Sequence, residues 1–277
     1  MIPRSQAADQ QQIFMFIDRM EYKPSDRDSQ RQSAVLMTKA GPISIFFNPY
    51  RQVAACSVPH NLHVHKSHVS FNDILAVQPQ IKVVSTIERV KGKSFPIVSI
   101  MKGMTFCLVD LTDAPEVLTA LRAGEAPAMM LDKEWNSGFS GAIYYERRGE
   151  DSASEPTIYN VHVRMITQGV EDPGTGSGNC ALACYLALAA GKQSPKEQLK
   201  SAKREEDLAA KTEKIKLDDK NEHHVFAIEQ GLEMGRKCTI AIEVDIKEGK
   251  DGKRAVTGLV LSGRCSFFTR GEIMGVY

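Results

Sequence analysis

A glycine-rich turn directly before an apolar helix is the part of the sequence best suited to chemistry. Residues 174–179 read GTGSGN, and the Ala- and Leu-rich segment 180–190 follows and is predicted to stop at Gly191. Glycines allow tight turns and let a ligand come close to the backbone. The helix start presents amide N–H groups and the positive end of the helix dipole. This combination is suited to binding a carboxylate or a phosphate.

Two common anion-binding motifs are excluded by the residues around this turn. No Gly-Lys-Ser/Thr follows it, as a P-loop requires, and no acidic residue stands where a dinucleotide-binding βαβ unit would place one. A glycine-rich helix start without any ligand fits the spacing equally well. The turn alone therefore leaves both interpretations open.

A second group of chemically capable residues is a run of histidines. The segment PHNLHVHKSH contains four of them: His60, His63, His65 and His68. On a strand, His63 and His65 would share one face and could bind a transition metal. The run has no carboxylate or cysteine partner at metal-ligand spacing, although Cys56 is close. A polar edge segment leading into a helix is the simpler interpretation, so we assign no metal ligand.

Single residues carry weaker signals. Trp135, the only tryptophan, follows Asp132 and is interpreted as a packing anchor, although it could line a cleft. Cys180 lies just inside the glycine-rich helix start, where the helix dipole could lower a thiol pKa. The chain has six cysteines, but it is long and shows no secretory signal. Reduced thiols are therefore expected rather than a disulfide framework.

The elements that must position these residues form an α+β fold with largely antiparallel sheet. Ala34–Thr38 and Ile43–Phe47 flank a Gly-Pro turn and predict a hairpin. Ser70 with Asp73, and Asp113 with Glu116, predict capping boxes at two helix starts, and Gly124 predicts the end of the second helix. Further strands are predicted at 13–17, 53–58, 95–101, 105–111, 137–145, 159–166, 226–231, 238–244, 255–262 and 265–268.

Composition excludes several classes of protein. The chain has 277 residues with 42% hydrophobic and 25% charged residues, which are ordinary globular values. Its formal net charge is +1, so it lacks the basic excess of a nucleic-acid-binding protein. No apolar run approaches the roughly 18 residues that span a bilayer. We therefore expect a cytoplasmic protein with neither nucleic acid nor membrane as a partner.

A longer string resembles the signature of the PhzF family, isomerase-like proteins related to diaminopimelate epimerase. The string comprises Arg164-Met165, the run Glu171-Asp172-Pro173-Gly174-Thr175-Gly176-Ser177, and the Ala-rich helix after it. Glu229-Gln230-Gly231 with Met234-Gly235-Arg236 resembles a later strand-turn segment of that family, and Leu261–Cys265 resembles its final hairpin. The resemblance extends over about residues 34–277, and the charged stretch at about 192–220 reads as an insertion.

The resemblance implies a diaminopimelate epimerase-like fold of two pseudo-symmetric halves. Each half would wrap a sheet around a central helix, with the substrate in the cleft between the halves. We expect residues 1–92 to form an incomplete first half and residues 93–277 the second half. Family members transfer a proton by general acid–base catalysis on a small carboxylated substrate, without cofactor or metal. The resemblance makes Asp172 the catalytic carboxylate, and it makes the following turn the substrate cradle: Gly174, Thr175, Gly176, Ser177 and Gly178.

The first 33 residues depart from the family pattern. They contain neither the Ser-Glu-Thr segment that carries the family's principal base nor the Gly-His-Pro turn that opens its first central helix. Glu21 does not match the motif, so no catalytic role is assigned to it. A site with one recognisable carboxylate would exchange protons slowly, and an uncovered sheet edge would favour a homodimer.

These observations leave three functional hypotheses. The first is a PhzF-like isomerase or proton-transfer enzyme that acts on a small carboxylated metabolite, in secondary metabolism as phenazine biosynthesis is. The second is a catalytically impaired remnant that serves as a binding or assembly protein. The third is a metal-binding module centred on the histidines.

Overall fold

The computed structural model of the chain describes residues 32–39, 41–135, 138–151, 154, 156–190, 221–249 and 251–265. The chain divides into two compact units, Met1–Pro59 with Val260–Tyr277, and His60–Leu259. The boundary after Leu259 falls inside strand β12 (Arg254–Arg264). The predicted strand at 13–17, Glu21 and the charged stretch at 192–220 lie outside the described residues.

The first unit contains a short antiparallel sheet. Its strands are β1 (Gln32–Thr38), β2 (Gly41–Asn48), β3 (Val53–Ser57) and the last residues of β12. Thr38 pairs with Gly41 at the β1–β2 turn, which confirms the predicted hairpin. Strand β3 pairs with β2 on one side and with residues 260–264 of β12 on the other.

The second unit is built on a larger mixed sheet with the strand order β12-β11-β10-β8-β7-β6-β5-β4, and β9 pairs with β8. The pairs β6–β7 and β8–β10 are parallel, whereas the prediction was largely antiparallel. Its further strands are β4 (His63–Ser70), β5 (Ser94–Met101), β6 (Met104–Asp110), β7 (Phe139–Asp151), β8 (Ile158–Thr167), β9 (Val170–Asp172), β10 (Asn221–Gln230) and β11 (Cys238–Glu248). A large sheet with few helices agrees with the predicted α+β class.

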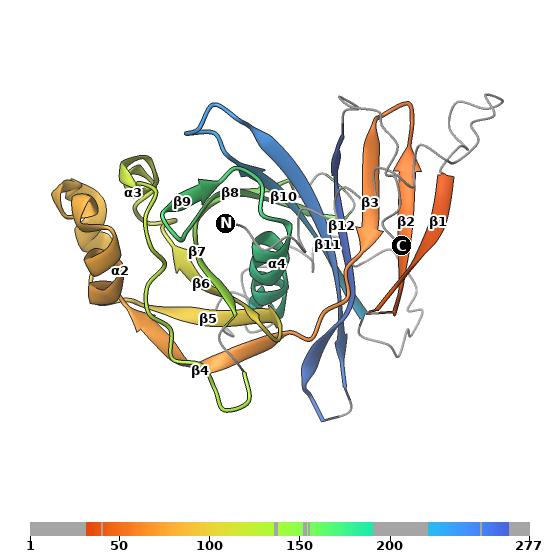
Figure 1. The fold of residues 1–277 in the computed structure, drawn as a ribbon, viewed down its shortest axis with the longest axis horizontal. Helices are drawn as coiled ribbons and strands as arrows, with labels where there is room; N and C mark the ends of the chain where they lie inside the picture. Colours follow the sequence, from red (N-terminus) through yellow and green to blue (C-terminus); the bar gives the residue numbers. More distant parts are fainter. Residues whose placement is uncertain are drawn as a thin grey trace, which may run out of the picture. The chain divides into compact units, whose positions relative to one another are not determined.

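Helix α4 (Gly176–Ala190) lies inside the curve of this sheet and contacts β5, β6, β7, β10 and β11 (Figure 1). Ala and Leu dominate its sequence and are among the best helix formers. The segment from Cys180 to Cys184 is fully buried. A helix that is apolar on all sides needs such an environment, because no side of it suits water.

The outer face of the sheet is covered by shorter helical segments. These are α2 (Phe71–Val77), the 3₁₀ helices η1 (Pro79–Val83) and η2 (Ser85–Arg89), and α3 (Glu116–Ala120). Their apolar side chains pack with Cys107, Tyr144 and Ile166 in one buried cluster. The sheet of the second unit thus lies between α4 and this outer layer (Figure 1).

The two predicted capping boxes have different outcomes. The Ser70 box is confirmed: the Asp73 amide donates to Ser70 Oγ at 3.2 Å, and the Ser70 amide donates to Asp73 Oδ2 at 3.1 Å. The Asp113 box is wrong, because α3 begins after Pro115 without a side-chain cap. Asp113 lies too early for that role, and its carboxylate pairs with Lys93 at 2.6 Å instead.

Two other expectations about helix ends and membranes can be compared with the structure. Helix α3 ends at Ala120, four residues before the predicted stop at Gly124. In the described part of the chain, no helix is both long and apolar enough to cross a membrane. Those residues include all six cysteines and contain no disulfide. The predicted division into epimerase-like halves at residue 92 stays a prediction.

Candidate active site

Strand β9 directs two neighbouring carboxylates to opposite faces of the sheet. Glu171 pairs with Ile166 of β8, whose side chain belongs to the outer cluster, and Asp172 pairs with Met165. Met165 also pairs with Ile143, which packs near the start of α4. Because side chains alternate along a strand, Asp172 lies on the α4 side and Glu171 on the outer side.

Asp172 organises the turn that leads into α4. Its Oδ1 accepts a hydrogen bond from the Gly174 amide at 3.0 Å, and its Oδ2 accepts one from Thr175 Oγ1 at 2.8 Å. This is the local side-chain-to-backbone pattern for which Asp is favoured in turns. The carboxylate is half-buried, and each oxygen keeps capacity for a further hydrogen bond or a proton.

Gln230, at the end of β10, fastens the turn to the sheet. Its fully buried side chain accepts from the Thr175 amide at 3.1 Å and from Asn179 Nδ2 at 2.7 Å. It donates to the Asp172 carbonyl at 2.6 Å and to Thr175 Oγ1 at 3.2 Å. One amide side chain therefore holds Asp172, Thr175 and the first turn of α4 together. All these contacts to Gln230 are uncharged hydrogen bonds.

Thr175 is the residue that caps α4. The Asn179 amide donates to the Thr175 carbonyl at 3.1 Å, the first bond of the helical series. The amides of Gly176, Ser177 and Gly178 precede that bond, so the helix itself supplies no carbonyl for them. The positive end of the helix dipole lies at the same place, and both features favour an anion there.

Close packing explains two glycines of the turn. A Cβ on Gly178 would lie 2.7 Å from Ile143 Cδ1, and Gly178 is buried. A Cβ on Gly174 would lie 3.1 Å from Cys238 Sγ. Both positions therefore require glycine for space, whether or not a ligand binds.

The turn after β10 supports the loop from below. Gly231 has a φ of +77°, and a Cβ there would lie 2.4 Å from the Arg236 carbonyl oxygen and 3.0 Å from that of Pro173. The Arg236 amide donates to the Gly231 carbonyl at 2.9 Å, which closes the turn. Only glycine fits this position, which lies against the residue that follows Asp172.

Cys238 places a thiol beside this carboxylate. The residue is half-buried at the start of β11, opposite Gln230. Burial and the negative charge of Asp172 raise the pKa of the Cys238 thiol above its usual range. The thiol is therefore protonated at neutral pH and is a poor nucleophile there.

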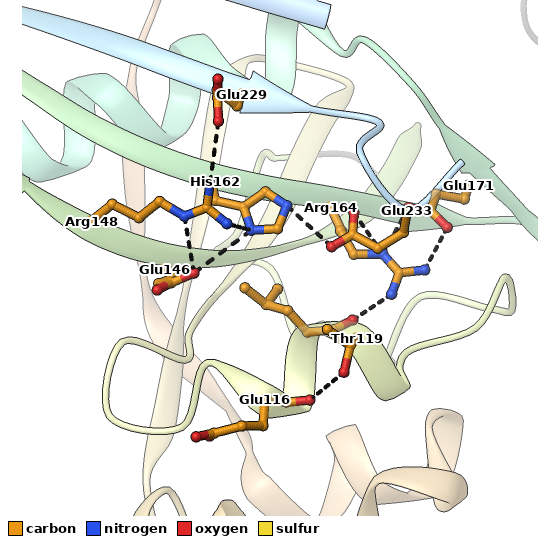
Figure 2. A network of polar contacts seen from close by, with 10 residues as sticks. Glu116, Thr119, Glu146, Arg148, His162, Arg164, Glu171, Glu229 and Glu233 are labelled. Carbon is orange, nitrogen blue, oxygen red and sulfur yellow. Dashed lines mark hydrogen bonds and ion pairs between the residues drawn. The ribbon is translucent and has the colours of Figure 1, made fainter. Parts of the chain in front are cut away.

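Arg164 holds Glu171 on the outer face of the sheet (Figure 2). Its Nε and one terminal nitrogen donate to the two Glu171 oxygens at 2.8 and 2.7 Å, and its other terminal nitrogen donates to the Leu118 carbonyl. Arg164 and Glu171 are buried. This bidentate pair joins β8, β9 and α3, and it leaves Glu171 engaged in structure.

A charged network continues from Arg164 along β8 (Figure 2). Arg148 donates to His162 Nδ1 at 2.8 Å, so the ring proton of a neutral His162 lies on Nε2. That nitrogen lies 3.2 Å from Glu233 Oε1, in a geometry outside the range of a hydrogen bond. Glu233 Oε2 in turn lies 3.8 Å from Arg164 Nε. These groups link the β10–β11 turn to the outer face of the sheet.

The predicted site residues occupy one continuous loop and helix start. Asp172, Gly174 and Thr175 contact one another directly, and Gly176, Ser177 and Gly178 form the first turn of α4. The sequence analysis did not assign Cys238 or the anchoring role of Gln230. Gln230 was part of a quoted string, but Cys238 carried no signal beyond its residue type. Their catalytic and substrate-binding roles stay predictions.

Comparisons with known proteins add one similarity. No family model matches the chain, and no curated protein matches it. The chain is similar to a solved structure described as the Bacillus anthracis phenazine biosynthesis protein of the PhzF family, with 15% sequence identity and a TM-score of 0.46. The match covers 85% of this chain and 66% of that chain, so it spans just under two thirds of that protein. The functional argument below rests on the site of this chain.

Proposed function

We propose that the chain is a PhzF-like isomerase or proton-transfer protein that binds a small carboxylated metabolite at the start of α4. The observation that carries the proposal is the joint anchoring of Asp172 and the α4 N-terminus by Gln230. A proton carrier and an anion-binding helix start are thereby held next to each other. The motif that resembles the PhzF signature covers the same residues.

The first turn of α4 would bind the carboxylate group of the substrate. Backbone amides and the helix dipole provide partial positive charge without a flexible cation. The same charge would stabilise the negative charge that develops when a proton leaves the carbon next to that carboxylate. The turn therefore contributes to binding and to the reaction.

Asp172 would carry the proton. Its oxygens each accept one hydrogen bond from the turn, which fixes the plane of the carboxylate and leaves lone pairs available. As general base it would take the proton from the substrate carbon, and as general acid it would return the proton. The proposal assigns no cofactor to this step.

One carboxylate limits the expected rate. A general acid or base typically contributes about 10²–10⁴-fold, so a site with a single group is a slow enzyme. Slow proton exchange that depends on Asp172 is the activity we assign to the chain alone. A binding or assembly role without chemistry is the outcome if no exchange occurs.

Calorimetry with small carboxylates tests the anion-binding part of the proposal. Ser177→Pro removes one amide donor, and proline is tolerated in the first turn of a helix. We expect at least a fivefold weaker binding of the carboxylate, about 1 kcal/mol. Ser177→Ala is the matched control, because it keeps the amide and removes only the hydroxyl. Equal affinity in the proline variant and the wild type would remove the helix start from the proposal.

A cytoplasmic homodimer belongs to the same proposal. Val35 and Met37 lie on one face of β1 and are 54% and 75% exposed. In the described residues β1 pairs only with β2, and such an edge can pair with a second copy. Light scattering should give a dimer mass for the wild type and a monomer mass for Val35→Lys with Met37→Lys. A monomeric wild type would contradict this part.

A further inference from the structure

The histidine-rich strand acquires a carboxylate partner from a distant loop. His63 and His65 are two residues apart on β4, the last strand in the sheet order of the second unit. Asp132 lies in the loop between α3 and β7. One nitrogen of each imidazole and one Asp132 oxygen all lie within 4.8 Å of one another. The sequence analysis found no such partner, because Asp132 lies 67 residues beyond His65 in the chain.

The His63–Asp132 pair forms the accessible part of this cluster. His63 Nε2 lies 2.9 Å from Asp132 Oδ2, and the two side chains are 31% and 20% exposed. The hydrogen bond with His63 holds the pKa of Asp132 below its usual range. The carboxylate is therefore charged at neutral pH, and solvent can reach the space beside it.

His65 forms the buried part of the cluster. Its Nδ1 accepts a hydrogen bond from the Asp132 amide at 3.0 Å, and its Nε2 lies 2.9 Å from Ser99 Oγ. These contacts set a neutral ring and tie the backbone of residue 132 to β4. Ser99 Oγ also lies 2.6 Å from Thr105 Oγ1, so its hydroxyl has a second partner if an ion replaces the His65 contact.

Trp135 fixes the orientation of both imidazoles. Its ring stacks on His63 with a centroid distance of 4.4 Å and an interplanar angle of 12°. It meets His65 edge-on at 5.8 Å and 84°, and Lys102 Nζ lies 5.8 Å from the tryptophan ring. An aromatic wall of this kind restricts ring rotation and so pre-organises the nitrogen donors.

We propose that His63, His65 and Asp132 bind one divalent transition-metal ion of the zinc type, with water in the remaining position. Two imidazoles and one carboxylate form the ligand set of catalytic zinc sites. Bonds of about 2.1 Å require the donors to approach to roughly 3.4 Å in a tetrahedral complex, a small closure from the present separation. An ion that binds all three residues displaces one of the present His65 hydrogen bonds.

The single tryptophan provides a direct readout. Trp135 is the only tryptophan of the chain, so its emission reports the ring stacked on His63. Titration of the full chain with Zn²⁺, and separately with Co²⁺, should change this emission in a saturable way with one ion per chain. Calorimetry with the same ions provides the stoichiometry without relying on fluorescence.

Variants distinguish this site from other histidines. Asp132→Asn and His63→Ala should each weaken Zn²⁺ binding at least tenfold, about 1.4 kcal/mol. His68→Ala and His223→Ala are the matched controls, because both rings are exposed and lie outside the cluster. Both controls should bind Zn²⁺ as the wild type does. Circular dichroism checks that each variant is folded.

Two results would overturn the proposal. One is the absence of a saturable response to Zn²⁺ up to about 1 mM, where an affinity that weak is non-specific. The other is unchanged affinity in both Asp132→Asn and His63→Ala. Neither result bears on the α4 site, which shares no residue with this cluster.

Discussion

Glu171 and Asp172 are neighbours in the chain, yet the two faces of β9 give them opposite surroundings. Glu171 is buried against Arg164, which donates to both of its oxygens. Asp172 is half-buried and accepts from a glycine amide and a threonine hydroxyl. One carboxylate is thus held by a full positive charge and the other by neutral donors.

This difference separates a structural carboxylate from a reactive one. A bidentate guanidinium partner stabilises the charged form and removes the geometric freedom to accept a substrate proton. Neutral donors orient a carboxylate with less stabilisation of its charge, so it can still be protonated. The comparison predicts that substitutions on the outer face change stability, whereas substitutions on the α4 face change binding and proton transfer.

Arg164→Ala is expected to have the largest effect on stability. The substitution leaves Glu171 as a buried charge without its partner and also removes the bond to the Leu118 carbonyl. The free energy of unfolding should fall by about 3–5 kcal/mol. Urea denaturation measures this loss.

The double substitution Arg164→Met with Glu171→Met is the control for that experiment. Replacing both charges by apolar side chains removes the isolated charge, so most of the stability should return. A double variant that is as unstable as Arg164→Ala would show that the ion pair is not the cause.

Gln230→Ala should have the next largest effect and should act on the α4 face. It leaves the Thr175 amide and the Asn179 side chain without their buried acceptor. Unsatisfied buried groups of this kind cost about 2–3 kcal/mol here, and carboxylate binding should weaken as well. Glu229→Ala, the preceding residue on the opposite face of β10, should cost less than about 1 kcal/mol. Equal losses in the two variants would contradict the anchoring role of Gln230.

Alkylation of Cys238 measures the charge on Asp172 with a smaller effect. Burial and Asp172 raise the pKa of this thiol, so iodoacetamide should react slowly at neutral pH and faster only as the pH rises past the usual thiol range. Asp172→Asn removes one of the two causes and should increase the rate about twofold at pH 8. Peptide mass spectrometry follows the Cys238 adduct.

Glu171→Gln is the control for the alkylation experiment. Its side chain lies on the other face of β9, so the Cys238 rate should stay unchanged. An increase that matches the effect of Asp172→Asn would show that the two carboxylates do not have separate environments.

The sequence could predict the α4 site because its residues are contiguous. Residues 172–178 contain the turn, the cap and the helix start, and local hydrogen bonds of Asp172 and Thr175 build most of the arrangement. The capping box at Ser70 was predictable for the same reason. Gln230 and Cys238 enter the site from strands more than 50 residues away, and sheet order alone brings them there.

Long-range pairing explains what the sequence analysis missed elsewhere. Asp132 reaches His63 and His65 through a loop whose path has no periodic pattern. The parallel pairing of β8 with β10 depends on a connection across residues 191–220, and no local motif encodes it. The Asp113 cap failed because a local rule met a nonlocal competitor, Lys93.

Asp172→Asn provides a clean variant for the central claim, because it should leave the fold intact. Asparagine is also favoured in this type of turn and keeps an oxygen for the Gly174 amide. We expect a change in the free energy of unfolding of less than about 1 kcal/mol. A cooperative denaturation curve close to that of the wild type establishes that any loss of activity is chemical.

Solvent-deuterium exchange into small α-amino, α-hydroxy and cyclic unsaturated carboxylates then tests the account most directly. The wild type should incorporate deuterium slowly but above the buffer rate, and Asp172→Asn should reduce that rate by about 10²–10⁴-fold or to the buffer rate. Asp113→Asn, an exposed carboxylate on the outer layer, should exchange as the wild type does. Exchange at equal rates in the wild type and Asp172→Asn would contradict the assignment of Asp172 as the proton carrier.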